Sequence, residues 1–590
     1  MRGNIQIQKE AVLNRWKTYF EELLNGENEH SLEETDRVEG PIEEITEEEV
    51  GTALRGMKSR KAPGPTGLTG EMLKNADIVK DLTRVFRDII KEGEIPEEWK
   101  DSLTIPIYKG KGDALECGKY RGIRLLEHGM KLFERILEMR LRRLIKVDSR
   151  QFGFTPGRST IDALFIVRQV QEKYNEKRKK LYHVFVDLEK AFDRVPRRAI
   201  EWALRRQKVP ERLVKAVMDL YVDSRSRVKT AAGTSETFHI RVGVHQGSTL
   251  SPLLFITVME EATRLARGDG PWELLYADDL VLTAESKEDA IYMFNRWKTE
   301  MEQRGLKINM EKTKYMVTGN RAREAIQSGR WPCGCCGRGV GANSMLCIEC
   351  NKWCHRRCSG LRNFRGVRNF VCPKCAREEE DDEIDGEDVG LVVSGGTLED
   401  VQQFCYLGDM LDCEAGVERA VRARVAYAWK KWREIASLLV NRSIGLRTRG
   451  QIYEACVRSA LLYGAETWAM TDRLTEILLR CDRRMLRYMA GVKWQDRMAS
   501  SEVAGMCGVD DLSVKLRQKR LRWFGHVKRA EGSLLYEVGE MRVEGQRPVG
   551  RPKKRWKDCV MEDMDLLGIE ERMAQDRQRW KAAIARPTPC

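Results

Sequence analysis

A pair of adjacent aspartates between two apolar runs constrains the fold of this chain more than any other feature. The segment from Leu274 to Leu282 reads LLYADDLVL, with Asp278 and Asp279 near its centre. Short apolar runs on both sides of a polar pair predict a β-hairpin that carries both carboxylates at its turn. Adjacent carboxylates on a tight turn repel each other, and a bound cation relieves that repulsion. The segment therefore predicts a cation site, with a solvated Asp-Asp turn as the simpler alternative.

A second segment supplies a third carboxylate. Residues 184–193 read VFVDLEKAFD, a buried-strand pattern whose polar end begins with Asp187. If this strand and the hairpin are neighbours, Asp187, Asp278 and Asp279 form an oxygen-rich cluster that suits Mg²⁺. Two such ions about 4 Å apart can activate a primer hydroxyl and stabilise the leaving pyrophosphate.

Together, the two segments resemble the metal-binding motifs of the reverse transcriptase palm. The resemblance implies an α+β fold: a right-hand polymerase with fingers, a palm built on an antiparallel sheet, and a helical thumb. It also implies that Asp187, Asp278 and Asp279 are catalytic and hold two Mg²⁺ ions in the palm. The expected reaction is the RNA-templated addition of dNTPs to the 3′-hydroxyl of a primer.

Segments that precede the palm match the same family. Residues 61–68, KAPGPTGL, resemble the loop that opens the fingers in reverse transcriptases of non-LTR retrotransposons. Thr66 stands where that family usually has Asp, which removes a turn carboxylate but leaves a hydroxyl able to cap. Lys109 and Arg121 match basic residues that lie over the triphosphate of the incoming nucleotide, where cations neutralise developing charge. A solvated basic loop is the alternative for Lys109.

The resemblance assigns two further residues to the template and the sugar. Arg158 is expected to touch template phosphate, although helix capping by Ser159 or Thr160 explains most of its segment. Phe192 is expected to pack under the incoming sugar and to collide with a ribose 2′-OH. An aromatic residue beside a strand is otherwise an ordinary core residue, which is the alternative for Phe192.

Another block and one lysine complete the expected site. Gln246 and Gly247 belong to a template-positioning block, VGVHQGS, which comes before a helix with Pro252 in its first turn. Gly247 allows close backbone approach, and Gln246 can hydrogen-bond near the nascent base pair. Lys312 best matches a lysine that protonates the pyrophosphate, with Lys314 as the alternative.

Cysteine spacing predicts a metal-binding segment. Seventeen cysteines would suit a secreted disulfide scaffold if they were evenly spread, but nine lie between Cys333 and Cys375. The ligands form four consecutive pairs with two-residue spacers: Cys333 and Cys336, Cys347 and Cys350, His355 and Cys358, Cys372 and Cys375. Such a spacer lets both ligands of a pair face one tetrahedral zinc ion. The pattern therefore favours metal in a reducing compartment over the alternative of a disulfide cluster.

The same spacing resembles a PHD finger, with Trp353 and Phe370 at matching positions. In that family the first and third pairs bind one Zn²⁺ and the second and fourth pairs bind another, so two zinc ions are expected. Cys335 and Cys354 are surplus, and Cys335 could compete as a ligand. A histone tail is a further candidate partner, because PHD fingers often bind such tails, although some are only folded spacers.

These segments predict a domain order. We expect an N-terminal helical extension (1–50), reverse transcriptase fingers and palm (51–320), a PHD-like zinc finger (331–377), an acidic linker (378–390), a primer grip and helical thumb (391–495), and a basic C-terminal region (496–590). In the last region, residues 519–527 and 550–556 interleave basic residues with Trp, which predicts phosphate contacts and stacking surfaces for single strands. A nuclear-import signal, a minor-groove hook and a solvated basic face are the alternatives there.

The charge of the chain fits a nucleic-acid partner. Its 590 residues carry a formal net charge of +14, which suits a polyanion but is also common in ordinary soluble proteins. No apolar run approaches the roughly 18 residues that a membrane span requires. We therefore expect an RNA template, a DNA primer or target and dNTPs as partners, no membrane, and an intracellular location in nucleus and cytoplasm.

Two rival functions use the same residues. One is a catalytically inactive or domesticated protein that binds nucleic acid or chromatin through the PHD-like finger, a hypothesis that Thr66 slightly favours and the three aspartates oppose. The other is an RNA-templated RNA polymerase, which Phe192 should exclude. About fifty residues precede the fingers, far fewer than the 100–200 of a typical domain, so we also expect the chain to lack a DNA-nicking activity.

Overall fold

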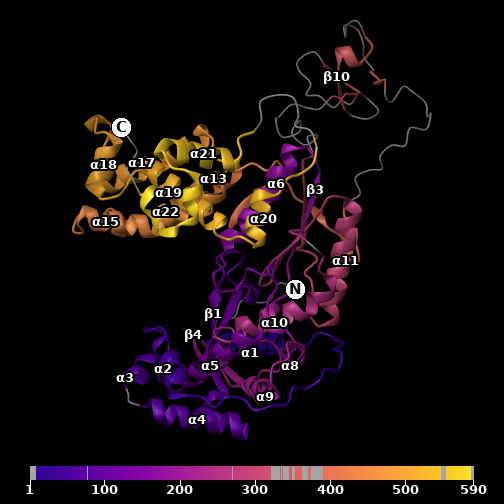
Figure 1. The fold of residues 1–590 in the computed structure, drawn as a ribbon, viewed down its shortest axis with the longest axis vertical. Coiled ribbons are helices and arrows are strands. Elements are labelled where there is room, and N and C mark those ends of the chain that lie inside the picture. The colour runs from indigo at the N-terminus through magenta and orange to yellow at the C-terminus, as the bar shows by residue number, and fades with distance from the viewer. Residues whose placement is uncertain are drawn as a thin grey trace. The chain divides into compact units, whose positions relative to one another are not determined.

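The computed structural model describes most of the chain (Figure 1): residues 8–75, 78–268, 270–319, 333, 335–336, 344–347, 352–361, 370–373, 390–545 and 553–585. These residues form two compact units. Unit 1 comprises residues 1–163, 184–282 and 291–313, and unit 2 comprises 164–183, 283–290 and 314–590. The chain passes between the units more than once, whereas the predicted domains follow one another along the sequence.

Helices form a large part of unit 1. Its helices are α1 (Lys9–Asn25), α2 (Glu47–Arg55), α3 (Gly70–Asn75), α4 (Val79–Glu92), α5 (His128–Leu144), α7 (Ala191–Arg194), α8 (Arg197–Arg206), α9 (Glu211–Asp219), α10 (Ser251–Thr263) and most of α11 (Lys287–Gln303), with 3₁₀ turns at Glu97–Trp99, Cys117–Lys119 and Arg264–Ala266. All of α10 except Pro252 is buried, as expected for a helix that is apolar all round. Pro252 lies in the first turn of α10, as predicted.

One sheet of unit 1 has the strand order β2-β1-β4-β5, with β6 also paired to β4. Its strands are β1 (Asp101–Tyr108), β2 (Tyr120–Leu125), β4 (Arg225–Thr230), β5 (Gly233–Thr234) and β6 (Phe238–His239). Strands β1 and β2 are antiparallel, with Ile107 opposite Arg121, while β1 and β4 are parallel. This hairpin fixes the place of both predicted triphosphate-binding residues, because Lys109 directly follows β1 and Arg121 lies on β2.

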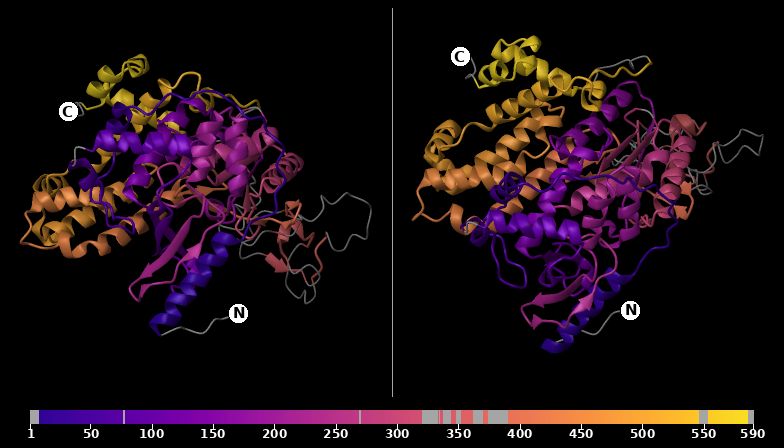
Figure 2. Two further views of the ribbon diagram at one scale, coloured as in Figure 1. Left: turned by 90° about the horizontal axis from the view of Figure 1, so that it is seen from below. Right: turned by 60° about the horizontal axis from the view of Figure 1, so that its bottom comes forward.

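The predicted N-terminal helix is confirmed as α1, which ends before Gly26. Its apolar residues Phe20, Leu23 and Leu24 are buried against Val228 of β4 and Phe238 of β6, and the helix lies along these strands (Figure 2). An amphipathic helix is held in this way by its apolar stripe.

A second sheet carries the aspartates, in the order β14-β9-β3-β8-β7. Its strands are β3 (Leu181–Val186), β7 (Glu273–Tyr276), β8 (Asp279–Ala284), β9 (Lys314–Thr318) and β14 (Glu399–Asp400). Strands β7 and β8 form the predicted hairpin, and β3 is the direct neighbour of β8. The order therefore places the end of β3, where Asp187 follows, beside the hairpin.

Unit 2 contains the remaining helices of the described residues. They are α6 (Thr160–Glu176, which begins in unit 1), α13 (Glu418–Glu434), α14 (Ala436–Leu439), α15 (Leu446–Tyr453), α16 (Ser459–Leu461), α17 (Asp472–Ala490), α18 (Ser500–Cys507), α19 (Leu512–Lys528), α20 (Leu534–Glu540), α21 (Trp556–Leu567) and α22 (Arg577–Ile584). A π-helical turn covers Glu454–Arg458, and 3₁₀ turns cover Arg356–Cys358, Ala465–Thr467, Trp494–Asp496 and Glu571–Gln575. Within the predicted thumb, the sequence predicts helices over 421–439, 449–462 and 474–489. All three regions are helical, but the first is divided between α13 and α14, and the second among α15, the π-helical turn and α16.

Short hairpins complete unit 2. Strand β10 (Ser344–Leu346) pairs with β11 (Trp353–His355), β12 (Val392–Val393) with β13 (Gly396–Thr397), and β15 (Gln403–Tyr406) with β16 (Asp409–Asp412). The last of these confirms a hairpin at the predicted primer grip. Its turn residues Leu407 and Gly408 both have positive φ, as a two-residue hairpin turn matched to the strand twist requires.

The C-terminal region corrects one prediction. Trp556 is buried, and its indole N–H donates to the carbonyl of Glu466 at 2.7 Å. Its ring packs edge-on against Phe165, with centroids 4.7 Å apart. Trp556 is therefore a core residue of unit 2 and not an exposed stacking surface for single strands, because its side chain is almost fully buried and packs against Phe165 of α6. Residues 550–552 of the same motif lie outside the described residues.

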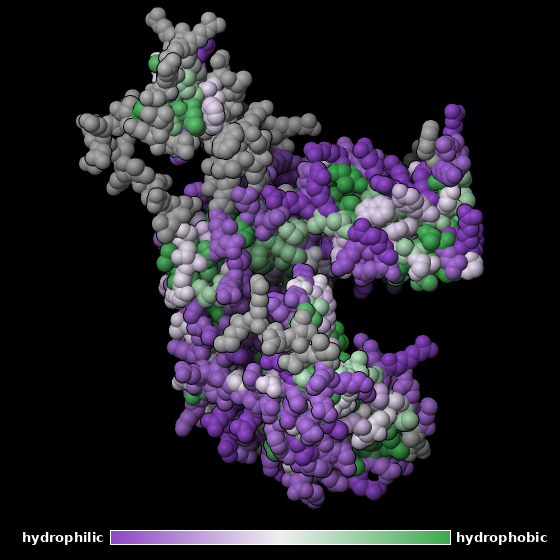
Figure 3. Space-filling model, turned by 180° about the vertical axis from the view of Figure 1, so that it is seen from behind, coloured by the Kyte–Doolittle hydropathy of each residue, from purple (hydrophilic) through white to green (hydrophobic). Residues whose placement is uncertain are grey.

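Hydrophilic residues cover most of the described surface on the face drawn in Figure 3. No described helix is both long enough and apolar enough to cross a lipid bilayer.

Candidate active site

The hairpin between β7 and β8 presents the aspartate pair. Tyr276 lies opposite Asp279, so the turn consists of Ala277 and Asp278, and Asp279 is the first residue of β8. Ala277 has a φ of +58°, which a residue with a Cβ rarely adopts. The Gln151 side-chain oxygen accepts the Ala277 N–H at 3.0 Å, and this bond holds the strained turn in place.

Gly153 fits against the same turn. A Cβ at position 153 would lie 2.4 Å from the backbone nitrogen of Ala277, so only glycine allows this approach. The side chain of Gln151 also accepts the N–H of Gly153 at 2.9 Å. The segment after Ser149 thus supports the hairpin from behind, a role that its sequence did not predict.

Asp187 follows β3 and is held through its backbone. Its N–H donates to the Thr313 hydroxyl at 3.3 Å, and its carbonyl accepts the N–H of Asn309 at 2.8 Å. Since β3 pairs beside β8, Asp187 lies near Asp278 and Asp279. The structure therefore brings together the three predicted catalytic aspartates.

Electrostatics confirm that the three carboxylates interact. Desolvation raises the pKa of Asp278, and repulsion from Asp187 raises it further. Desolvation, together with repulsion from Asp278 and Asp187, raises the pKa of Asp279 to about 6. A bound cation would remove the part of this rise that repulsion causes.

Lys312 forms an ion pair with one of these carboxylates, that of Asp187. Its ammonium lies 3.1 Å from a carboxylate oxygen of Asp187. The alternative, Lys314, instead pairs with Glu399 at 2.6 Å. Lys312 and Arg121 both lower the pKa of Asp278, so both are within electrostatic reach of the aspartates.

Lys109 belongs to the same group of cations. Burial lowers its pKa, and the neighbouring charges of Arg121 and Lys312 lower it further. Its ammonium donates to the carbonyl of Gly118 at 3.1 Å, within the turn between β1 and β2. Lys109, Arg121 and Lys312 thus approach one another from three separate segments, which is the arrangement that a triphosphate requires.

Gln246 and Gly247 form a tightly held turn. The carbonyl of Gln246 accepts the N–H of Arg124 at 2.7 Å, and the Gln246 side chain donates to Asp193 at 2.8 Å. Gly247 has a φ of +116°, and a Cβ there would lie 2.6 Å from the carbonyl oxygen of Arg124. The sequence did not single out Asp193, because its partner is 53 residues away in the chain.

Phe192 lies on α7 and is half-buried. Its ring stacks on Phe255 of α10 with centroids 4.3 Å apart, and Phe154 meets it edge-on at 6.1 Å. These neighbours fix the orientation of the Phe192 ring. The alternative prediction, that Phe192 is a core residue, therefore accounts for its buried side. The steric role toward a ribose stays a prediction.

Arg158 has partners inside the protein. Its guanidinium donates to the carbonyl of Ser149 and lies over the Phe152 ring, 5.1 Å from the centroid. At the start of α6, the Asp162 carboxylate accepts the N–H of Ser159 at 2.7 Å and so ties the residue before the helix to its first turn. Capping by the hydroxyl of Ser159 or Thr160 stays a prediction. Contact between Arg158 and template phosphate stays a prediction.

Thr66 is anchored to Glu127, the residue before α5. Its backbone N–H and its hydroxyl donate to the two carboxylate oxygens of Glu127, at 2.8 and 2.7 Å. An aspartate at position 66 would place a second carboxylate against Glu127, whereas a hydroxyl donates to it. The Thr66 substitution is therefore matched to Glu127 and leaves the loop tied down.

The three carboxylates of this site have the donor chemistry that Mg²⁺ prefers. Three carboxylates offer hard oxygen ligands at the ends of adjacent strands, and the repulsion among them is the energetic condition that a divalent cation relieves. Within the described residues, only thiol-rich groups bring three or more ligand atoms within 4.8 Å of one another, so the carboxylates are spaced more widely than that.

A second candidate metal centre lies in the cysteine-rich segment of unit 2. Ligand atoms of Cys333, Cys336, His355 and Cys358 all lie within 4.8 Å of one another. His355 Nδ1 is 3.5 Å from the Cys336 sulfur and 3.8 Å from the Cys358 sulfur. A tetrahedral zinc ion with ordinary bond lengths separates such ligands by about 3.6 Å. The first and third pairs therefore meet as predicted.

The other predicted ligand set is only partly described. Cys347 and Cys372 are buried, and the Cys372 N–H donates to the Cys347 sulfur at 3.3 Å. Cys350 and Cys375 lie outside the described residues. The surplus pair also lies close by: the sulfurs of Cys335 and Cys354 are 3.2 Å apart.

The comparisons agree with the geometry of the palm. Residues 107–407 match the model of the reverse transcriptase (RNA-dependent DNA polymerase) family. This match covers half of the chain and contains all three aspartates, Lys312 and the cysteine-rich segment. The chain therefore belongs to the reverse transcriptase family.

Its relatives are proteins of mobile elements. The chain is 30% identical over 257 residues to the retrovirus-related Pol polyprotein from type-1 retrotransposable element R2 of Nasonia vitripennis, covering 42% of this chain and 25% of that protein. It is 22% identical over 572 residues to the RNA-directed DNA polymerase from mobile element jockey of Drosophila melanogaster, covering 93% of this chain and 55% of that protein. A probable RNA-directed DNA polymerase from transposon BS of the same fly is 22% identical over 489 residues, covering 80% and 48%. The chain thus spans between a quarter and about half of the length of these relatives.

Proposed function

We propose that this chain is an RNA-directed DNA polymerase of a non-LTR retrotransposon, which extends a primer 3′-hydroxyl with dNTPs. The observation that carries the proposal is the meeting of Asp187, Asp278 and Asp279 at the ends of adjacent strands, with Lys312 against Asp187. Family membership and the names of the relatives support it.

The proposed chemistry divides among the residues of the site. Asp187, Asp278 and Asp279 would hold two Mg²⁺ ions, which when bound lower the barrier at both the attacking and the leaving oxygen. Arg121 and Lys109 bind the triphosphate and neutralise its charge. Lys312, which already lies at the carboxylates, gives its proton to the leaving pyrophosphate.

The residues around the nascent pair orient the reactants. The side-chain amide of Gln246 donates to Asp193 at 2.8 Å, and this bond keeps the Gln246 side chain in one position beside the template. Phe192 is held against Phe255 and faces the sugar, where it excludes a 2′-hydroxyl. Positioning of this kind contributes to rate because reacting atoms meet in a near-attack geometry.

The direct test is primer extension. Purified protein is given an RNA template with an annealed DNA primer and Mg²⁺, and either dNTPs or rNTPs are added. The proposal predicts extension with dNTPs on the RNA template. A folded protein that binds the primed template yet extends nothing would favour the inactive binding protein, and preferred extension with rNTPs would favour an RNA polymerase.

For the cysteine-rich segment we propose a PHD-like finger that binds two zinc ions. One set is Cys333, Cys336, His355 and Cys358, and the other is Cys347, Cys350, Cys372 and Cys375. The distances within the first set support the proposal. Metal analysis of the purified chain should give two zinc ions, and one or none would contradict the interleaved sets. Titration with histone-tail peptides tests the further prediction of a chromatin partner.

A further inference from the structure

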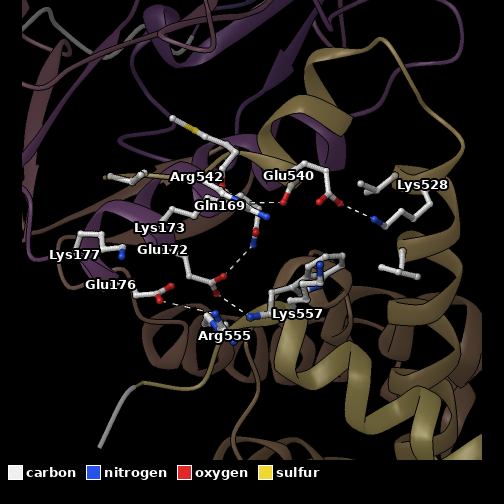
Figure 4. A pocket seen from close by; sticks show the side chains of 16 residues that line it. Gln169, Glu172, Lys173, Glu176, Lys177, Lys528, Glu540, Arg542, Arg555 and Lys557 are labelled. Atoms are coloured by element: carbon white, nitrogen blue, oxygen red, sulfur yellow. Dashed lines mark hydrogen bonds and ion pairs between the residues drawn. The ribbon is translucent and has the colours of Figure 1, made fainter. Parts of the chain in front are cut away.

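A pocket inside unit 2 remains unexplained by the polymerase site. It has a volume of about 310 Å³ and lies among α6, α19, the segment after α20 and the start of α21 (Figure 4). Ligand pockets in proteins typically begin at about this size. The cavity therefore has room for about one nucleotide and none for a duplex.

The charges that line this pocket are mainly positive. Six cationic side chains face three carboxylates: Lys173, Lys177, Lys528, Arg542, Arg555 and Lys557 against Glu172, Glu176 and Glu540. Figure 4 shows Glu172 in the middle of these labelled groups. The lining thus carries a local excess of positive charge, which favours an anionic occupant.

Two of the cations are neutralised by carboxylates. Lys528 pairs with Glu540 at 2.5 Å and with Glu571 at 2.6 Å. Arg555 pairs with Asp558 at 2.7 Å and lies 3.8 Å from Glu176. These pairs build the wall of the pocket and leave little charge for a ligand.

The other four cations are not paired with a carboxylate among the described residues. Lys173 donates to the carbonyls of Gly539 and Met541, at 2.9 and 2.6 Å, so main-chain dipoles hold its ammonium at the pocket wall. Lys177 donates to the carbonyl of Gly545 at 2.6 Å. Arg542 and Lys557 are exposed and, within the described part of the chain, make no hydrogen bond or ion pair.

Glu172 is the exception to this positive lining. It accepts the backbone N–H of Trp556 at 2.8 Å, and burial raises its pKa to about 7. Close to neutral pH its carboxyl is therefore partly protonated, which reduces the one negative charge at the centre of the pocket. The floor is apolar, since Phe524, Val527 and Trp556 are buried beneath it.

We propose that this pocket binds the phosphodiester backbone of a single-stranded nucleic acid, with one nucleotide seated in the cavity. Arg542, Lys557, Lys173 and Lys177 contact the phosphates, and the apolar floor contacts the sugar. The choice of nucleic acid among polyanions rests on the proposed function. The pocket deepens that function by giving the chain a place to hold unpaired strand apart from the palm aspartates.

Binding of a fluorescent single-stranded RNA by the full chain tests the proposal, without Mg²⁺, dNTPs or primer. The test variant is the double substitution Arg542→Gln with Lys557→Gln. The matched control is Arg579→Gln with Lys581→Gln, which removes the same two charges from exposed positions on α22. Equal melting temperatures of the two variants establish that both fold.

We expect the pocket variant to lose about tenfold in affinity and the control to change by less than about twofold. The slope of log affinity against log salt should fall by about 1.4 in the pocket variant, because about 0.7 is lost with each single-strand phosphate contact. Glu172→Gln, which keeps the acceptor for Trp556 and removes the charge, should bind the strand more tightly at about pH 8.

Three results would overturn the proposal. The first is equal affinity in the pocket variant and its control. The second is an equal loss of affinity for a blunt duplex RNA, which cannot enter the cavity. The third is a pocket variant that no longer binds AMP or inorganic phosphate but still binds the single strand. This result would make the pocket a site for a free anion. None of these measurements requires catalysis, so failure of the polymerase proposal is recognised separately by primer extension.

Discussion

At the scale of single residues, Asp193 holds the side chain of Gln246, a contact that the sequence did not predict. The motif around Phe192 predicts a strand end and a short helix, but not that Asp193 is half-buried and accepts a hydrogen bond from the Gln246 side chain. Desolvation raises the pKa of Asp193, while the nearby guanidinium of Arg124 opposes this shift. Asp193 is thus a positioning residue that acts through Gln246.

Loss of this contact should reduce extension. Asp193→Ala leaves the Gln246 amide without its acceptor, so we expect a fall of about tenfold in the rate of extension, the equivalent of one hydrogen bond. Asp193→Asn retains an oxygen acceptor and should restore most of the rate. In a double-mutant cycle, Gln246→Ala should add little to Asp193→Ala. Additive losses would show that Asp193 acts on something other than Gln246.

Phe192 is suited to a test of sugar selection. Phe192→Ala opens the space beside the sugar, so discrimination against rNTPs should fall, by up to about 10²-fold. Phe192→Tyr keeps the ring on Phe255 and serves as the control. The ratio of kcat/KM for a dNTP and its rNTP measures the effect. An unchanged ratio in the alanine variant would place the gate elsewhere.

Thr66 and Trp556 show where residue types mislead. Thr66 departs from the family pattern, yet its hydroxyl pairs with Glu127, 61 residues away in the sequence. Trp556 stands in a basic run that predicts an exposed stacking surface, yet it is buried. Both outcomes depend on a partner that is distant in sequence, which a local pattern does not contain.

At the scale of elements, local patterns predict much more. The hairpin around Asp278 follows from two apolar runs of strand length, and both strands form, but the turn consists of Ala277 and Asp278, so Asp279 lies on β8 and not in the turn. α1 follows from its apolar spacing and Gly26. The division of the second thumb helix by a π-helical turn was not predictable, because it accompanies the buried pair of Arg458 with Asp482 at 2.8 Å.

The packing of α21 against α6 buries Glu172, and this burial should make the stability of the fold depend on pH. Burial raises the pKa of Glu172 to about 7, above the roughly 4.3 of an unfolded glutamate. The folded state therefore holds the extra proton between these values, and stability falls as the pH rises from about 4.3 to about 7. Glu172→Gln should remove this loss, worth up to roughly 3 kcal/mol.

Thermal unfolding tests whether stability falls as the pH rises. The melting temperature of Glu172→Gln should equal that of the wild type at low pH and exceed it increasingly as the pH rises through about 7. Glu176→Gln, on the same face of α6, controls for the loss of a glutamate from this helix. A constant difference at every pH would mean that Glu172 does not titrate in this range.

The cysteine-rich segment should depend on metal for its fold. So small an element has little apolar core, and zinc binding would supply most of its folding free energy. Chelation should therefore make the segment between 331 and 377 sensitive to protease while the palm keeps its resistance. His355→Ala should reproduce the effect, whereas Cys335→Ser, outside the predicted sets, should not. Loss of the palm on chelation would contradict separate folding.

At the scale of the whole molecule, the residues matched by the family model do not coincide with either of the two compact units. The family model matches residues 107–407 across the cysteine-rich segment, as expected for a segment inserted into a polymerase. The compact units instead join α6 to α21 and to the β15–β16 hairpin, because Phe165 packs against Trp556 and Arg168 pairs with Asp409 at 2.9 Å. Sequence order alone does not predict such long-range pairs.

The central claim is that Asp187, Asp278 and Asp279 perform the chemistry. The most direct measurement is single-turnover extension of a primed RNA template with saturating dNTP and Mg²⁺, comparing the wild type with Asp278→Asn and Asp187→Asn. Asp36→Asn, which removes a carboxylate from an exposed loop, is the matched control. The account predicts that both palm variants bind the primed template, melt like the wild type and extend no primer, whereas the control extends normally. Extension at the wild-type rate by Asp278→Asn would contradict it.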